Sequence, residues 1–261
     1  MTPDLQVRTT PGAQVTEYAA GMWRLSIPGG PGGCYRWAQL DDYLHRPRSA
    51  FRWQSPLRMS VRARVSDIDL PGTWGFGLWN DPFNVSLGLG GMSRRLPALP
   101  NAVWFFHAAP PNALALRDTH PAQGLLAATF ASRGVPAPLL ALGAPVLPLL
   151  GFPPTARLLR RLARRLIEED AARLEIDPTA WHTYGFAWQA DAVTFSLDGA
   201  ACFATDVAPR GRLGLVLWID NQYAAFPAEG RLRMGTSPNA PAWLELAQVE
   251  VEARAPDGNC A

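Results

Sequence analysis

The chain has 261 residues, of which 48% are hydrophobic, so it is long enough to bury a full core. Its formal net charge is only +2, and this small charge gives no indication of a nucleic-acid partner. All 24 basic residues are arginine. The absence of lysine excludes Schiff-base chemistry and a P-loop lysine.

The three cysteines, Cys34, Cys202 and Cys260, are widely spaced and contain no C-x-x-C pair. This odd number argues against a disulfide framework and against a zinc site. The first residues, MTPDLQVRTTPG, lack the apolar stretch of a secretory signal. We therefore expect a cytoplasmic protein without a cofactor or a metal ion, and we expect residues 1–14 to form a loosely held arm.

The first half of the chain predicts several short strands. Apolar residues alternate in 22–27, and the glycines and prolines of 28–33 predict a loop. Arginines and a serine alternate with apolar residues in 57–65, as in a half-buried antiparallel strand. In 73–81, Gly75 and Gly77 leave one face bare, which favours close approach of a ligand or tight packing of two sheets. Residues 101–107 are almost wholly apolar, as in a central strand covered on both faces.

Residues 125–177 interrupt this pattern. The segment 135–152 is uncharged, but its prolines and glycines argue against a membrane-spanning helix. A helix is predicted to follow Thr155, with an apolar stripe opposed by five arginines. The stripe consists of Leu158, Leu159, Leu162, Leu166 and Ile167, and the arginines are Arg157, Arg160, Arg161, Arg164 and Arg165. Such a segment could pack on the sandwich, cover an apolar ligand, or contact an anionic membrane through residues 135–173.

Three further strand signals follow. Residues 181–199, WHTYGFAWQADAVTFSLDG, alternate around a short turn, as in a β-hairpin that needs a second layer to cover its aromatic side chains. Residues 212–219 are an apolar run, and residues 243–252 alternate again. Many short strands separated by turns predict an antiparallel sandwich or jelly roll.

The hairpin WHTYGFAWQADAVTFSLDG resembles that of the concanavalin A-like lectin and glucanase superfamily, particularly glycoside hydrolase family sixteen. RMSVRARVSDIDLPGTWGFGLW, RLGLVLWID and WLELAQVEVEAR stand in the order expected for that family. The resemblance implies an all-β fold, an antiparallel two-sheet jelly-roll sandwich, with a carbohydrate cleft. We expect one domain over residues 1–261 and a mostly helical insertion over 125–177.

The hydrolases of this family carry an E-x-D-x-x-E motif, in which two glutamates act as nucleophile and general acid. The strand expected to correspond, 101–107, contains no carboxylate, so no catalytic residue can be assigned. We therefore expect lectin-like binding of a carbohydrate or another small molecule. A hydrolase with displaced carboxylates, drawn from Asp81, Asp118 and Asp220, is one alternative. A peripheral membrane protein, or one that binds an apolar ligand through residues 125–177, is another.

Aromatic rings that stack on a ligand and polar groups that orient it are the residues expected in such a cleft. The candidate ligand-binding residues follow or lie within the predicted strands and are Trp79, Asn80, Asp81, Trp104, His107, Trp218, Asp220 and Asn221. Packing in the core is the alternative explanation for each tryptophan, and capping of backbone groups is the alternative for each aspartate.

Overall fold

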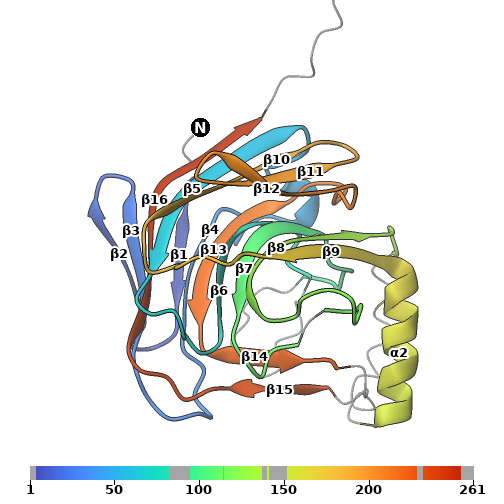
Figure 1. Cartoon of the computed structure of the whole chain (residues 1–261), viewed down its shortest axis with the longest axis horizontal. Coiled ribbons are helices and arrows are strands. Elements are labelled where there is room, and N and C mark those ends of the chain that lie inside the picture. Colours follow the sequence, from blue (N-terminus) through green and yellow to red (C-terminus); the bar gives the residue numbers. More distant parts are fainter. Residues whose placement is uncertain are drawn as a thin grey trace, which may run out of the picture.

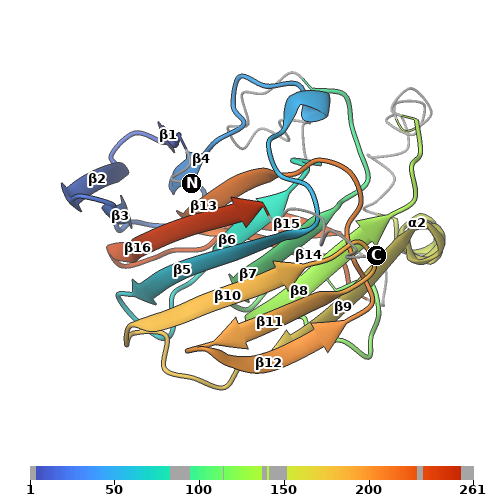
Figure 2. The ribbon, with the colours of Figure 1, turned by 90° about the horizontal axis from the view of Figure 1, so that it is seen from above.

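A computed structural model describes residues 4–82, 95–113, 115–136, 140, 152–227 and 232–253. They form two seven-stranded antiparallel sheets (Figures 1 and 2). Sheet A has the order β1 (Gln6–Thr9), β4 (Trp37–Asp41), β13 (Gly214–Asp220), β6 (Thr73–Trp79), β7 (Ala102–Ala108), β8 (Gly124–Ser132) and β9 (Ile167–Arg173). Sheet B has the order β12 (Ala200–Thr205), β11 (Val193–Leu197), β10 (His182–Trp188), β5 (Leu57–Val65), β16 (Ala242–Ala253), β3 (Met22–Ile27) and β2 (Gln14–Ala19).

The two sheets pack face to face, which confirms the predicted sandwich. Figure 1 shows that sheet A is curved, with the two-stranded ribbon β14 (Gln222–Ala225) and β15 (Arg233–Thr236) and the helix α2 (Pro153–Leu166) on its concave side. A short 3-10 helix, η1, spans Arg48–Ala50. The predicted loose arm is wrong over Gln6–Thr9, because these residues pair with β4 at the edge of sheet A.

The core lies between the two sheets, because every second side chain of the central strands points toward the opposite sheet. Aromatic rings of sheet A meet those of sheet B: the centroids of Phe76 and Tyr184 lie 5.1 Å apart, and those of Phe105 and Phe195 lie 5.3 Å apart. All four side chains are buried. Each buried aromatic ring removes a large apolar area from water, so these contacts join the two layers.

The expected mostly helical insertion over 125–177 is corrected by the structure. The segment begins within β8 and contains all of β9, and both strands belong to sheet A. Its one described helix is α2, which lies between them. Residues 137–139 and 141–151, within the apolar stretch, lie outside the described residues. Strand β9 has the sequence IEEDAAR, and pairing with β8 outweighs its weak intrinsic preference for a strand.

Helix α2 does not turn its whole apolar stripe toward the protein. Its buried residues are Ala156 and Arg160, whereas the side chains of Leu158 and Leu162 are exposed. The helix begins at Pro153, so Thr155 is not its N-cap. No helix among the described residues has the length and apolar character needed to cross a membrane.

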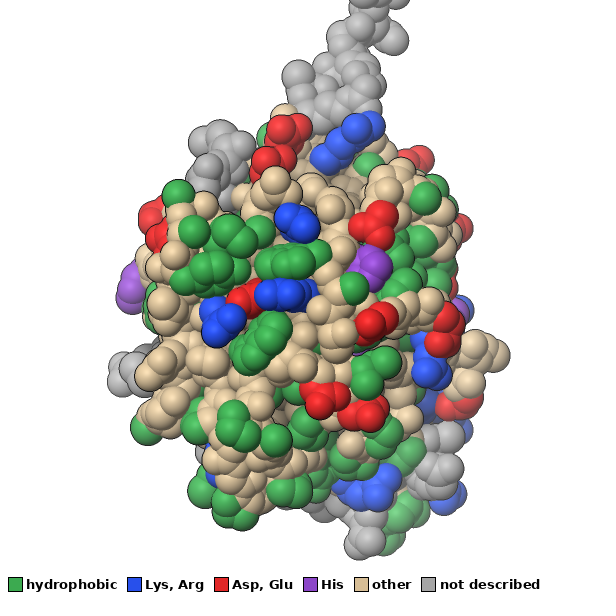
Figure 3. Space-filling model, turned by 60° about the vertical axis from the view of Figure 1, so that its left-hand side comes forward, with side chains coloured by type: hydrophobic (Ala, Val, Ile, Leu, Met, Phe, Trp, Pro, Cys, Tyr) green, Lys and Arg blue, Asp and Glu red, His purple; other side chains and the backbone are tan. Residues whose placement is uncertain are grey.

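The outer face of sheet B carries a row of stacked side chains, here called the Arg–Trp ladder: Arg24, Trp243, Arg64, Trp181 and Arg62. Each arginine Cζ in the row lies between 4.9 and 5.5 Å from the centroid of a neighbouring tryptophan ring. Glu245 lies under the ladder with 2% of its side chain exposed and accepts hydrogen bonds from Arg24 and Arg64. Figure 3 turns the side of β2 and β3 toward the viewer and shows basic side chains among apolar ones.

Candidate functional site

The outer face of sheet A carries a second aromatic cluster, which lies on its concave side. Trp79 of β6, Trp104 and Phe106 of β7, and Trp218 of β13 point away from sheet B and form what we call the aromatic floor. The ring centroid of Trp104 lies 5.9 Å from that of Trp79 and 5.6 Å from that of Trp218. The structure therefore brings together the three tryptophans that the sequence singled out.

Two glycines explain how such large rings fit side by side. Gly75 and Gly77 lie on the same face of β6, between the tryptophan-bearing strands β13 and β7. A Cβ at Gly75 would lie 2.8 Å from Cη2 of Trp218, and one at Gly77 would lie 2.5 Å from Cβ of Trp104. The close approach predicted for this strand is thus made by indole rings of neighbouring strands.

A polar edge borders the aromatic floor on β4 and β1, and sequence reasoning missed it. Gln39 donates a hydrogen bond to Asp41 (2.8 Å) and another to the hydroxyl of Tyr43 (3.3 Å). Arg8 lies 3.5 Å from the carboxylate of Asp41, and its Cζ lies 4.8 Å from the ring centroid of Trp37. Both Gln39 and Asp41 are buried. The sequence did carry a signal, because the polar Gln39 and Asp41 alternate with the apolar Ala38 and Leu40.

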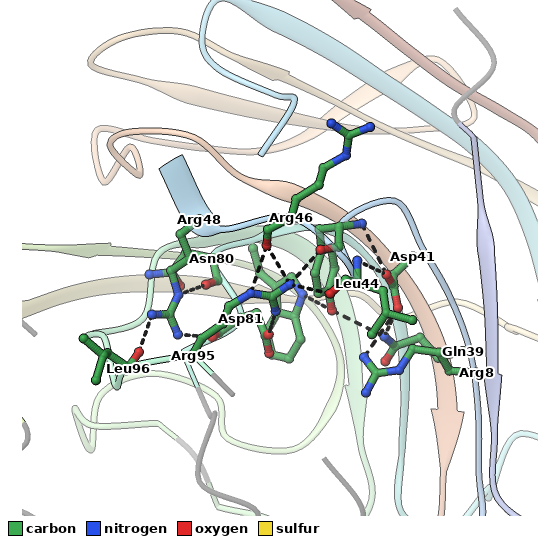
Figure 4. A network of polar contacts seen from close by, with 12 residues as sticks. Arg8, Gln39, Asp41, Leu44, Arg46, Arg48, Asn80, Asp81, Arg95 and Leu96 are labelled. Atoms are coloured by element: carbon green, nitrogen blue, oxygen red, sulfur yellow. Dashed lines mark hydrogen bonds and ion pairs between the residues drawn. The ribbon is translucent and has the colours of Figure 1, made fainter. Parts of the chain in front are cut away.

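A polar network closes one end of this face (Figure 4). Arg95 forms an ion pair with Asp81 and donates hydrogen bonds to the backbone carbonyls of Tyr43, Leu44 and Arg46. The side chain of Asn80 donates to the carbonyl of Leu99 (2.8 Å) and accepts from the N–H of Asn101 (2.9 Å). Two of the predicted ligand-binding residues, Asn80 and Asp81, therefore hold the connection between β6 and β7 in place.

Asp220 lies at the opposite end, on the same face of β13 as Trp218. Its carboxylate accepts hydrogen bonds from the hydroxyl of Thr73 (2.9 Å) and the N–H of Gln222 (3.0 Å). The Thr73 hydroxyl also accepts from the indole N–H of Trp218, at 2.9 Å. Burial raises the pKa of Asp220 to about 7, although these hydrogen bonds lower it in part.

The two other predicted ligand-binding residues lie away from the aromatic floor. His107 stacks on Trp74 with a centroid separation of 5.4 Å, on the core side of β7. Burial lowers the pKa of His107 to about 4. The side chain of Asn221 is fully buried, accepts from the N–H of Arg36 (2.8 Å) and donates to the carbonyls of Cys34 and Ser237. Of the eight candidates, four therefore border this face: Trp79, Trp104, Trp218 and Asp220.

Asp220 lies too far along the strands from Asp81 and from Asp41 to form a glycosidase pair with either of them. Asp220 pairs with Thr73, whereas Asp81 follows Trp79 at the other end of β6. Six residues of strand separate these positions, which is about 20 Å. Asp41 pairs with Val216, four residues before Asp220, so those two are separated by about 13 Å along the strand. Paired carboxylates need to be within about 10 Å.

Other acidic groups near this face are occupied by the chain itself. Glu169 of β9 is buried and accepts hydrogen bonds from the N–H groups of Leu116 and Arg117. Asp118 accepts from Arg160 and Arg164 of α2. Within the described ranges, no three metal-ligating side chains lie close enough together to hold an ion.

The raised pKa of Asp220 predicts how stability changes with pH. The folded state holds a proton on Asp220 up to about pH 7, whereas the unfolded state loses it near its ordinary pKa of 3.8. The contribution of Asp220 is therefore fully present below the unfolded pKa and is lost as pH rises through about 7, by about 1.4 kcal/mol per pH unit. His107 acts in the opposite direction between its folded pKa of about 4 and its ordinary value of 6.5.

The Asp220→Asn variant separates the effect of Asp220 on pH-dependent stability from that of His107, because it keeps His107 unchanged. Between about pH 5 and about pH 8, the wild type should lose roughly 3 kcal/mol of unfolding free energy relative to this variant. Urea denaturation of both proteins at the two pH values measures that difference. Parallel changes in the two proteins would show that Asp220 is ionised in the folded state at neutral pH.

Comparisons with known proteins agree on the fold. No protein family and no curated protein matches the sequence. Among solved structures, an endo-β-1,4-glucuronan lyase from the fungus Trichoderma reesei has a TM-score of 0.52 at 10% identity, covering 95% of this chain and 90% of the lyase. A glycoside hydrolase family protein from Mycobacterium thermorestibile has a TM-score of 0.51 at 12% identity, covering 96% and 94%. The chain therefore has the jelly-roll fold of these carbohydrate-active proteins.

Proposed function

We propose that this protein binds a carbohydrate on the outer face of sheet A and does not hydrolyse it. The observation that carries the proposal is the aromatic floor, which places three tryptophans and a phenylalanine on the concave side of the sheet. Aromatic rings stack on the C–H faces of sugars, and this stacking is the interaction that we expect to hold the ligand. Two solved structures with the same fold are an endo-β-1,4-glucuronan lyase and a glycoside hydrolase family protein, which supports the choice of ligand class.

The indole N–H of Trp104 gives this proposal a polar contact. This nitrogen is buried and has no hydrogen-bond partner among the described residues. Buried donors are nearly always paired, so an unpaired one calls for an explanation. A sugar hydroxyl or ring oxygen over the floor would accept this hydrogen bond after a small rotation of the ring.

The residues that point outward from β7 support the proposal that the protein does not hydrolyse its ligand. Their side chains are Ala102, Trp104, Phe106 and Ala108, and none can act as an acid or a nucleophile. A hydrolase with displaced carboxylates is the alternative, and it would have to use groups as far apart as Asp41 and Asp220. A flat apolar ligand on the same floor is a further alternative. The predicted cytoplasmic location stays a prediction.

Soluble oligosaccharides of β-1,4-glucan and β-1,4-glucuronan are suitable probes, followed by calorimetry and tryptophan fluorescence. We expect Trp104→Ala to weaken binding by about tenfold or more, because one stacked ring contributes about 1 kcal/mol and one hydrogen bond a similar amount. Trp181→Ala, on the outer face of sheet B, is the matched control and should bind as the wild type does.

Three outcomes would overturn the proposal. Equal binding by the wild type and the Trp104→Ala variant, with thermal unfolding confirming that both are folded, would place the ligand elsewhere. Release of shorter oligosaccharides, abolished by Asp41→Asn or Asp220→Asn, would make the protein an enzyme. Binding of only a flat apolar dye, and of no sugar, would favour the apolar ligand.

A further inference from the structure

Two arginines of helix α2 hold it on the protein, while two of its leucines, Leu158 and Leu162, are exposed. Arg160 is 5% exposed and donates hydrogen bonds to the backbone carbonyls of Ala115 (2.9 Å) and Phe226 and to Asp118 (2.7 Å). Arg164, one turn later, donates to the carbonyl of Leu116 and to the other oxygen of Asp118 at 2.7 Å. These contacts fix the rotation of the helix about its axis.

This rotation turns the leucines outward. Leu158 is 49% exposed and Leu162 is 43% exposed, and Phe152, just before the helix, is 59% exposed. Residues four apart lie on the same face of a helix, so Leu158 and Leu162 form one ridge. In a soluble protein, a surface helix ordinarily turns its leucines toward the core. The reversed orientation therefore requires a partner that accepts exposed leucines.

The charged side chains beside this ridge indicate that its partner is anionic. At 100° per residue, Arg161 and Arg165 flank Leu158 and Leu162 on the outward face, and Arg157 borders it. All three arginines are exposed, and the helix contains no acidic residue. Asp118 pairs with Arg160 and Arg164, the arginines that hold the helix on the protein. The outward face thus combines the exposed Leu158 and Leu162 with the exposed Arg161 and Arg165.

We propose that α2 docks this protein onto an anionic lipid surface, with its axis parallel to the membrane plane. The leucines would enter the boundary between headgroups and acyl chains, while the arginines would contact the lipid phosphates and carboxylates. The ion pairs with Asp118 hold the helix as a preformed element, so no folding of α2 accompanies docking. This inference does not rest on carbohydrate binding, because it uses residues of α2, which packs beside β9, and none of the tryptophans of β6, β7 and β13.

Vesicles of phosphatidylcholine, with and without phosphatidylserine, provide the test by cosedimentation of the full chain. We expect binding only to the anionic vesicles, and weaker binding at higher salt. Leu158→Asn with Leu162→Asn, and separately Arg161→Glu with Arg165→Glu, should each reduce binding by about tenfold or more. These side chains point into solvent, so circular dichroism should show that both variants remain folded.

Matched controls separate the helix face from general surface properties. Val7→Asn with Ile68→Asn removes apolar side chains of similar exposure elsewhere, and Arg58→Glu with Arg210→Glu makes the same change in net charge. Both controls should bind vesicles as the wild type does. Absence of wild-type binding at low salt, or equal losses in the controls, would overturn the proposal. A dimer in lipid-free solution that dissociates in the Leu158→Asn and Leu162→Asn variant would assign the face to a second copy of the chain instead.

Discussion

The Gly75→Ala variant is expected to unfold at a temperature lower by roughly 10 °C, which corresponds to a loss of about 3 kcal/mol in a protein of this size. A Cβ at Gly75 would lie 2.4 Å from the carbonyl oxygen of Phe105 and 2.8 Å from the ring of Trp218. The first contact is with backbone, so it can be relieved only by moving β7 away from β6. Differential scanning calorimetry measures the change.

Gly134→Ala is the matched control, because a Cβ there would have no neighbour within 4 Å. It should unfold within about 1 °C of the wild type. Adding Trp218→Ala to Gly75→Ala should not restore stability, since the clash with the Phe105 carbonyl remains. Wild-type stability of the Gly75→Ala variant would contradict the close packing of β6, β7 and β13 on which the aromatic floor depends.

Removing both cations from Glu245 should also cost about 3 kcal/mol of unfolding free energy. In the Arg24→Met and Arg64→Met double variant, the methionine side chains keep much of the packing of the arginine stems, but Glu245 is left without a positive partner. Its side chain is only 2% exposed, so water cannot replace the two guanidinium groups. Urea denaturation at neutral pH measures the loss.

A third substitution distinguishes charge burial from lost stacking. Adding Glu245→Met should recover most of the stability, because a buried ion pair can often be replaced by apolar residues with little cost. Recovery will be incomplete, because the contacts of both arginines with Trp243 are still missing. Arg58→Met, which removes an exposed arginine from the same strand β5, should leave stability unchanged. If the triple variant were no more stable than the double variant, the loss would come from the Arg–Trp ladder itself.

Strict alternation made some strands readable from the sequence. The strands predicted at 22–27 and 57–65 match β3 and β5 residue for residue, and each has one face on the core and one on solvent. Strands without such a pattern were missed. In β9, three of seven residues are acidic, and Glu169 is buried only because loop N–H groups at Leu116 and Arg117 bind its carboxylate. Partners that distant in sequence leave no local signal.

The same reason explains why the sequence left the orientation of α2 open. Its leucines form a clear stripe in the sequence, and such a stripe ordinarily faces the core. The orientation of the helix is instead determined by hydrogen bonds from its arginines to Asp118 and to the carbonyls of Ala115, Leu116 and Phe226. Those groups come from two loops, one of them more than sixty residues away along the chain. Only the fold brings them to Arg160 and Arg164.

For the candidate site, the sequence predicted the types of residue better than the face of the sheet on which each side chain lies. Trp79, Trp104 and Trp218 were expected as stacking residues, and they lie on one face. In β7, however, apolar residues point to both sides, so the sequence could not tell that Trp104 faces outward while His107 faces the core. The polar edge at Gln39 and Asp41 lies within β4, whereas most of the predicted polar ligand-binding residues follow the ends of strands.

The position of β16 within sheet B sets the order in which the protein can be completed during synthesis. This strand pairs with β5 on one side and β3 on the other, yet it follows every other described strand along the chain. Until the ribosome has released Ala242–Ala253, sheet B consists of two separate parts, β2 with β3 and β5 with β10, β11 and β12. Each part presents an unpaired strand edge to other nascent chains. We therefore expect newly made molecules to aggregate or to recruit chaperones until β16 inserts. Its insertion pairs the free edges of β3 and β5 at the same time.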